Sequence, residues 1–294
     1  MTARSGQKDI ATLVSLLDDS DHSLVPVVRE RLIGMGSPVI AILKSYRQQY
    51  RDNPKLLHRL DGVIADIQLN RATEALVTWH SGREPDLIQG LCLLFELIKP
   101  ETRSEALSHS LYEMANEIWM ELSDAQTAVE QVHLFNHIFY HRLGFKAEDP
   151  FLSDPMLAML DNALNNRRGN PVLFGLIYLA FAFRSGLDIK AVVFPGGFMP
   201  VCVDEQDNIL FYINIYQSGE LLAKEQLRKL LADWGFVIPQ KDFALCDAVA
   251  LVGIYAESLY FIAGNTENKE MEQLLEEVLA IFGDKRYLII EEEE

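Results

Sequence analysis

The sequence is poor in cysteine. Its 294 residues hold three cysteines, Cys92, Cys202 and Cys246, at wide spacing and without a C-x-x-C pair. An odd number of widely spaced thiols argues against a disulfide framework and against a cysteine zinc site. The cysteine pattern therefore predicts a reducing, cytoplasmic location, with no metal and no other cofactor.

Basic residues are also scarce. Lysine and arginine number 26 against 43 aspartates and glutamates, which gives a net charge of −17 and an isoelectric point near 4.8. Such a chain repels phosphate backbones and acidic lipid surfaces. We therefore expect neither nucleic acid nor membrane as a partner.

Long hydrophobic runs are lacking as well. The first residues, MTARSGQKDIATL, contain no apolar core of signal-peptide length. The longest apolar stretch, residues 171–183, falls short of the ~20 residues that a membrane-spanning helix needs. We expect no membrane-spanning segment.

What the chain does contain is an ordinary globular share of apolar residues, 49%. Residues 8–47 show three short helical stripes, joined by D-D-S-D and by G-M-G-S-P. This pattern resembles a HEAT repeat, and a single such repeat must stack on neighbouring helices to bury its apolar face. We therefore predict a HEAT-like helical region over residues 1–80.

The rest of the chain divides by its periodicity into helical, extended and again helical parts. Helical patterns cover 54–80, 85–97, 103–122, 125–140, 151–165 and the apolar stretch from 171. Extended, β-branched patterns follow at 189–194, 198–203 and 209–216. Helical patterns return at 222–234, 244–263 and 269–281. The predicted fold is α+β and mainly helical, with a core domain over 81–240 and C-terminal helices over 241–294 that pack on it.

Three motifs stand in the part where the helical and extended patterns meet. They are R-R-G-N-P-V-L-F over 167–174, F-P-G-G-F over 194–198 and Y-I-N-I-Y-Q-S-G over 212–219. Asn170 and Pro171 have the residue types of a helix N-cap and a first helical position. A polar loop therefore leads into a buried helix, and a small antiparallel sheet follows it.

In order, spacing and flanking residues, these motifs resemble the SirB-type bacterial branch of the transglutaminase-like superfamily. That branch shows R-x-G-N-P-[IVL]-S-L, then P-G-H-F or P-Q-H-F, then F-I-[DN]-P-F-x-x-G, and the likeness extends over residues 120–235. The resemblance implies a papain-like core in which the helix carries a nucleophile and the strands carry a histidine and its orienting partner. Such chemistry needs the nucleophile at a helix N-terminus and a base within reach of it.

The departures from the resemblance fall on the reacting groups. Leu173 stands in the nucleophile's place and Gly197 in the histidine's place, and neither side chain can carry a proton. Asn214 stands in the third position, where it could orient an imidazole but has none to orient. The resemblance therefore implies a scaffold with a degenerate triad and no catalytic residue.

Displaced groups offer an alternative. Cys202 could act as the thiol, with a base from His133, His137 or His141, which follow one another at i, i+4 and i+8. This alternative requires thiol and imidazole within hydrogen-bonding reach. The same histidine spacing could bind a metal, but it lacks the glutamate of H-E-x-x-H. Alternation along the strand predicts that Cys202 and Gly197 point to opposite faces.

The former cleft would be lined by Arg168, Asn170, Phe198 and Tyr212. Arg167 and Arg168 either brace the loop or stand as solvated charges. The sequence thus favours a catalytically inactive, transglutaminase-like binding or scaffold module with a protein or peptide partner. The alternative is a cysteine-dependent hydrolase or transamidase built on the displaced groups.

Overall fold

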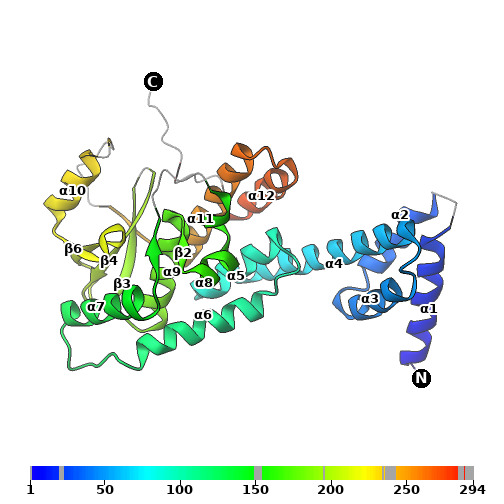
Figure 1. Ribbon diagram of the computed structural model, residues 1–294, viewed down its shortest axis with the longest axis horizontal. Coiled ribbons are helices and arrows are strands. Elements are labelled where there is room, and N and C mark those ends of the chain that lie inside the picture. The colour runs from blue at the N-terminus through cyan, green and yellow to red at the C-terminus, as the bar shows by residue number, and fades with distance from the viewer. Residues whose placement is uncertain are drawn as a thin grey trace. The chain divides into compact units, whose positions relative to one another are not determined.

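A computed structural model describes residues 2–19, 23–148, 154–194, 196–233, 235, 243–283 and 288 (Figure 1). The chain forms two compact units, residues 1–75 and residues 76–294. The predicted α+β, mainly helical fold is confirmed. The further division of the second unit at residue 240 stays a prediction.

The first unit is helical in its described residues. Its elements are α1 (Thr2–Leu17), α2 (Leu24–Ile33), the 3₁₀ turn η1 (Ser37–Val39), α3 (Ile40–Gln49) and most of α4 (Pro54–His80). Pro38 occupies the start of η1, where its missing N–H costs no hydrogen bond. The three helices predicted within residues 8–47 are thus confirmed, and their likeness to a HEAT repeat stays a prediction.

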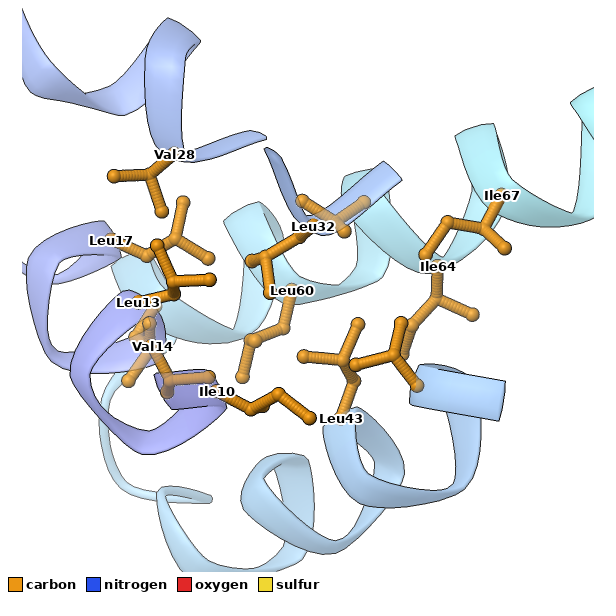
Figure 2. Close-up of a cluster of buried hydrophobic side chains, with 13 residues drawn as sticks. Ile10, Leu13, Val14, Leu17, Val28, Leu32, Leu43, Leu60, Ile64 and Ile67 are labelled. Carbon is orange, nitrogen blue, oxygen red and sulfur yellow. The ribbon is translucent and has the colours of Figure 1, made fainter. Parts of the chain in front are cut away.

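Aliphatic side chains from all four helices meet in the core of the first unit. Figure 2 shows Leu13 and Leu17 of α1, Leu43 of α3 and Leu60 of α4 pointing into one cluster. Because each helix buries one stripe, none of them could exclude water from its apolar face alone. The sequence pattern therefore gives this unit its own hydrophobic core.

The second unit begins with helices and continues into the region of the three motifs. Its first elements are α5 (Leu87–Ile98), α6 (Ser104–Trp119), α7 (Ala128–Asn136), the π-helical turn η2 (His137–Arg142), β1 (Lys146–Ala147), η3 (Pro155–Ala158), α8 (Leu160–Asn166), β2 (Arg168–Gly169) and α9 (Pro171–Arg184). Its later elements are β3 (Ile189–Phe194), β4 (Gly197–Val203), β5 (Ile209–Asn214), η4 (Ile215–Gln217), β6 (Glu220–Leu222), α10 (Lys224–Asp233), β7 (Leu245–Cys246), α11 (Ala248–Asn265) and α12 (Lys269–Phe282).

Several element boundaries differ from the sequence prediction. The helix expected over 244–263 begins only at Ala248, because Leu245 and Cys246 pair with β3 as a strand. The helix expected over 125–140 begins at Ala128, because Thr127 and Glu130 form a reciprocal capping box, and it widens into η2 at His137. The helix expected over 151–165 is divided between η3 and α8, and residues 151–153 lie outside the described part. The strand expected to reach residue 216 ends at Asn214, which caps η4.

Five of the described strands of the second unit form an antiparallel sheet in the order β6-β5-β4-β3-β7, while β1 and β2 form a separate parallel pair. On one face of the sheet, Val192, Met199 and Val201 pack with Leu227 and Leu231 of α10. The apolar helix α9 contacts β3 and β4. The sheet is therefore covered by α10 on one side and by the motif-bearing α9 on the other.

Helix α11 is the most apolar long element of the described chain. By length and composition it could cross a membrane, but 61% of it is buried within the structure. It contacts α5, α9 and α12 (Figure 1), and the Tyr255 hydroxyl donates to the carbonyl oxygen of Ala158 at 2.7 Å. These contacts are those of a core helix in a globular unit.

Candidate functional site

The loop before α9 is braced by Arg167. This residue ends α8 in a left-handed conformation, with φ at 59°. Its guanidinium donates to the carbonyl oxygen of Leu164 at 2.5 Å and lies 5.2 Å from the centre of the Phe145 ring. Arg167 therefore satisfies a carbonyl at the end of α8 and fixes the direction of the chain, which supports the bracing role over a solvated charge.

The neighbouring Arg168 is tied to a short parallel ladder. Strand β2 pairs with β1, placing Arg168 beside Lys146. The Arg168 guanidinium forms an ion pair with the Glu148 carboxylate, which comes from just beyond β1. The side chain is exposed, so it neutralises a local carboxylate at the surface of the loop.

Asn170 and Pro171 start α9 as the sequence predicts. The Asn170 side-chain oxygen accepts a hydrogen bond from the N–H of Leu173 at 2.8 Å, and Pro171 takes the first helical position. The cap occupies a backbone donor that a helix N-terminus otherwise offers to an anion. The predicted N-cap is confirmed.

Leu173, predicted to stand in the nucleophile's place, lies in the first turn of α9. Its side chain is 0% exposed, and the following residue, Phe174, packs with Phe139 and Tyr140 of η2. A leucine in this setting contributes only burial of apolar surface. Leu173 and Phe174 therefore belong to the core, while Pro171 and Val172 are half-buried.

Gly197 and Phe198 point to opposite faces of the sheet. The Phe198 ring lies against α9, because a Cβ added to Gly175 would stand 2.9 Å from its Cζ. A Cβ added to Gly197 would instead stand 3.6 Å from the Phe194 ring, which belongs to the cluster around Leu227 of α10. The backbone at Gly197 is therefore aimed away from α9.

Asn214, predicted to stand in the third position of a degenerate triad, caps a turn. Its side-chain oxygen accepts from the N–H of Tyr216 at 3.2 Å, and its carbonyl oxygen accepts from the N–H of Gly219 at 3.0 Å. The residue is buried. Both hydrogen bonds shape the segment from 214 to 219, which gives Asn214 a structural role.

A buried polar network holds that segment against the helices. The Asn136 amide nitrogen donates to the carbonyl oxygen of Gly219 at 2.9 Å, and the Tyr178 hydroxyl donates to the Asn136 oxygen at 2.7 Å. The Tyr140 hydroxyl donates to the carbonyl oxygen of Ile215 at 3.1 Å. Burial raises the pKa of both tyrosines well above its ordinary value. They therefore remain neutral donors at physiological pH.

This network is not predicted by any motif of the sequence. Asn136 is the polar exception within the buried stripe formed by Val132, Phe135 and Phe139. Since a buried amide must find partners, its place in that stripe was the available signal. What it pairs with lies 83 residues away in the chain and could not be read locally.

The three histidines of the α7–η2 segment lie on its outer side. His133, His137 and His141 are all exposed, and the rings of His137 and His141 are 5.3 Å apart. In the part of the chain that the structure describes, no group of three or more His, Cys, Asp and Glu side chains is arranged to hold a metal ion.

Cys202 lies on the α9 side of the sheet and is 2% exposed. Burial raises the pKa of its thiol to about 11, and the nearby Asp188 carboxylate adds to the shift. A nucleophilic thiol needs the opposite, namely access and a lowered pKa. The buried thiol and the exposed histidines thus belong to different environments.

The four residues expected to line a cleft do not share one surface. Arg168 is exposed, and Asn170 is partly buried at the start of α9. Phe198 faces α9, whereas Tyr212 belongs to the cluster on the α10 side. A Cβ added to Gly175 would also stand 2.9 Å from the Ile215 Cδ1, so side chains fill the space beside the first turns of α9.

An N-capped helix packed against an antiparallel sheet is the arrangement that the resemblance predicts. A family model, described as the transglutaminase-like superfamily, matches residues 105–252, which span η2, α9 and the sheet. The chain belongs to the transglutaminase-like superfamily. The SirB-type branch and the loss of the triad are finer assignments that remain proposals.

Three bacterial relatives give the more particular likeness. The chain is 25% identical to a UPF0162 protein of Vibrio cholerae over 50% of its length and 53% of the relative's. It is 28% identical to the UPF0162 protein YchA of Escherichia coli K12 over 56% and 55% of the two lengths. It is 27% identical to a UPF0162 protein of Xylella fastidiosa over 42% and 45%. The chain thus spans about half the length of each relative. No solved structure matches the chain.

Proposed function

We propose that this protein is a catalytically inactive member of the SirB-type branch that acts as a binding or scaffold module. The observation that carries the proposal is the first turn of α9, where Leu173 is fully buried and its N–H is taken by Asn170. Acyl transfer requires a nucleophile and donors aimed at a developing oxyanion. Leu173 supplies no nucleophile, and its N–H, one of the donors that could face an oxyanion, is occupied by the Asn170 side chain.

The strand side of the site supports the same proposal. Gly197 has no side chain, and its backbone aims at Phe194 rather than at α9. The side-chain oxygen of Asn214 accepts a hydrogen bond from the N–H of Tyr216. The surroundings of the former triad therefore stabilise the fold.

The alternative, a hydrolase or transamidase that uses Cys202 and a histidine of the 133–141 helix, is disfavoured by burial. Its thiol is held in the protonated form inside the sheet, while the three imidazoles face outward. A rearrangement of β4 would have to precede any reaction. We propose a cytoplasmic location on the three cysteines, which are unpaired thiols.

The test is a search for turnover by the full chain. Amidase, peptidase and transamidase assays should stay at the background rate, both for the wild type and for a Cys202→Ser variant. The double substitution Leu173→Cys and Gly197→His should also stay inactive, because residue 197 points away from α9. Turnover that a single substitution between residues 170 and 214 abolishes would overturn the proposal.

A further inference from the structure

The C-terminal end of α6 presents two large apolar side chains to solvent. Trp119 is 59% exposed and Met120 is 70% exposed. The same helix buries Leu111, Ala115 and Ile118 against the core of the second unit. Trp119 and Met120 therefore do not belong to the face by which α6 packs on the second unit.

The surroundings of this apolar pair are acidic. Residues 113–130 contain five acidic side chains and no lysine or arginine. Glu117 and Glu113 precede Met120 by three and seven residues, so they share its side of the helix. The Glu121 carboxylate forms an ion pair with the Arg142 guanidinium at 2.5 Å. The His109 Nε2 lies 3.3 Å from the Glu113 Oε1. Most of the negative charge near Met120 remains unbalanced by a lysine or arginine of this segment.

The loop that follows α6 is fixed by its own hydrogen bonds. The N–H of Ser123 donates to the Gln126 side-chain oxygen at 3.1 Å, and the Gln131 amide donates to the carbonyl oxygen of Ser123 at 3.1 Å. Thr127 and Glu130 close the capping box of α7. The loop joins α6 to α7 (Figure 1), and binding at this surface would cost little ordering of the backbone.

We propose that Trp119 and Met120, with their acidic surroundings, bind a basic amphipathic protein segment. Apolar side chains of that segment would cover the flexible methionine, and a lysine or arginine would stack on the indole ring, which attracts cations. A second copy of this chain would bring the same negative charge to the same place, so charge complementarity favours a basic partner. This inference rests on the proposed binding function and assigns it a surface.

The experiment measures binding of a fluorescein-labelled ~18-residue leucine–lysine helix to the full chain by fluorescence anisotropy. We expect saturable binding that weakens with added salt, and no binding of a leucine–glutamate helix of the same length. The double substitution Trp119→Ala and Met120→Ala should raise the Kd about tenfold or more. Glu117→Lys should raise it several-fold without touching the apolar pair.

A matched control separates this surface from general attraction to an acidic protein. Leu210→Ala removes another side chain that is 52% exposed, and Glu270→Lys reverses a charge on α12. This control double variant should bind as the wild type does, and thermal melts should show all variants folded. Equal loss in the control, or unchanged binding after loss of Trp119 and Met120, would overturn the inference. Neither result would create turnover, so the proposed lack of catalysis is tested separately.

Discussion

Gly219 and Asn136 share one small volume between the loop after β5 and the end of α7. Gly219 has φ at +78°, and a Cβ there would stand 2.2 Å from the Asn136 amide nitrogen. That same nitrogen donates to the Gly219 carbonyl oxygen. Gly219 is therefore required for a structural reason: its positive φ and the adjacent Asn136 side chain both disfavour any larger residue.

We expect Gly219→Ala to destabilise the protein by about 3 kcal/mol or more, because it adds a clash with a buried, hydrogen-bonded amide to the strain of a positive φ. Gly186→Ala is the matched control, since Gly186 has φ at +75° and nothing within 4 Å of an added Cβ. That control should cost only about 1 kcal/mol. Urea unfolding measures both, and equal losses would contradict the role assigned to Asn136.

Residue roles were predictable from sequence where the partner is close in the chain. Asn170 caps an N–H three residues ahead, and residue types alone predict that. Asn214 also caps a local N–H, but its place in the resemblance suggested an orienting residue of a triad. The face of the sheet to which Gly197 points depends on the register of β4 with β3. Alternation along β4 predicts only that Gly197 and Phe198 point to opposite faces.

At the scale of the element, α9 begins with the Asn170 N-cap, and Leu173 in its first turn is fully buried. A helix N-terminus lowers a thiol pKa, while burial raises it and blocks reagents. Because Leu173 is fully buried, access decides the outcome. The reactivity of a thiol placed at residue 173 therefore reports whether solvent reaches the first turn of α9.

We expect a Leu173→Cys thiol to react with a water-soluble aromatic disulfide at least about a hundredfold more slowly than an exposed thiol, since reaction requires local opening. Leu210→Cys on β5 is the matched control, because its position is exposed. Unfolding in urea should bring the two rates together. Comparable rates in the native protein would show that the first turn of α9 is accessible.

Long elements were predicted from sequence better than short ones. The pattern over 54–80 coincides with α4, and the pattern over 189–194 coincides with β3. The pairs β1–β2 and β3–β7 were missed, because strands of two residues have no periodicity and exist only through their partners. The π-helical turn η2 was also missed, since its residues are as apolar as those of an α-helix.

At the scale of the whole molecule, the two units have separate cores. The first is the cluster around Leu43 and Leu60 (Figure 2), and Leu227 belongs to the sheet cluster of the second. Stability contributed by one core need not pass to the other. The sequence predicts a HEAT-like region over residues 1–80, and the contacts within the structure divide the chain after residue 75.

We expect Leu43→Ala to lower the stability of the first unit by about 2–5 kcal/mol while leaving the second unchanged. Hydrogen exchange measured by mass spectrometry should then rise in α1 to α3 and stay constant in α9. Leu227→Ala should do the reverse, as both leucines are fully buried. Loss of protection in both units from either substitution would contradict separate cores.

The pH dependence of stability follows from groups that are buried in their neutral forms. Burial raises the pKa of Cys202 from 9.0 to about 11 and that of Tyr216 from 10.0 to about 12. Below pH 9 both the folded and the unfolded chain hold these protons, so the contribution to stability is complete. Above it the unfolded chain loses protons first, and stability falls until the folded pKa values are passed.

We expect the urea midpoint to be level from pH 7 to 8.5 and to decline from pH 9 to 11. Between pH 9 and 11, the Cys202→Val variant should lose about 2 kcal/mol less free energy of unfolding than the wild type, since each pKa unit corresponds to about 1.4 kcal/mol. The same substitution should leave the slope below pH 8.5 unchanged. An identical alkaline slope in the variant would contradict the raised pKa of Cys202.

The order of the sheet also bears on how this protein behaves when it is damaged. Strand β4 is buried along its whole length, and the edges of the described sheet are the three-residue β6 and the two-residue β7. Short edges give a neighbouring molecule little backbone to pair with. Once the sheet opens, β3 and β4 would release two adjacent apolar strands of the kind that seeds aggregates. The native sheet thus keeps two aggregation-prone strands buried. Heating above the unfolding temperature should therefore cause precipitation, and the protein should not refold on cooling.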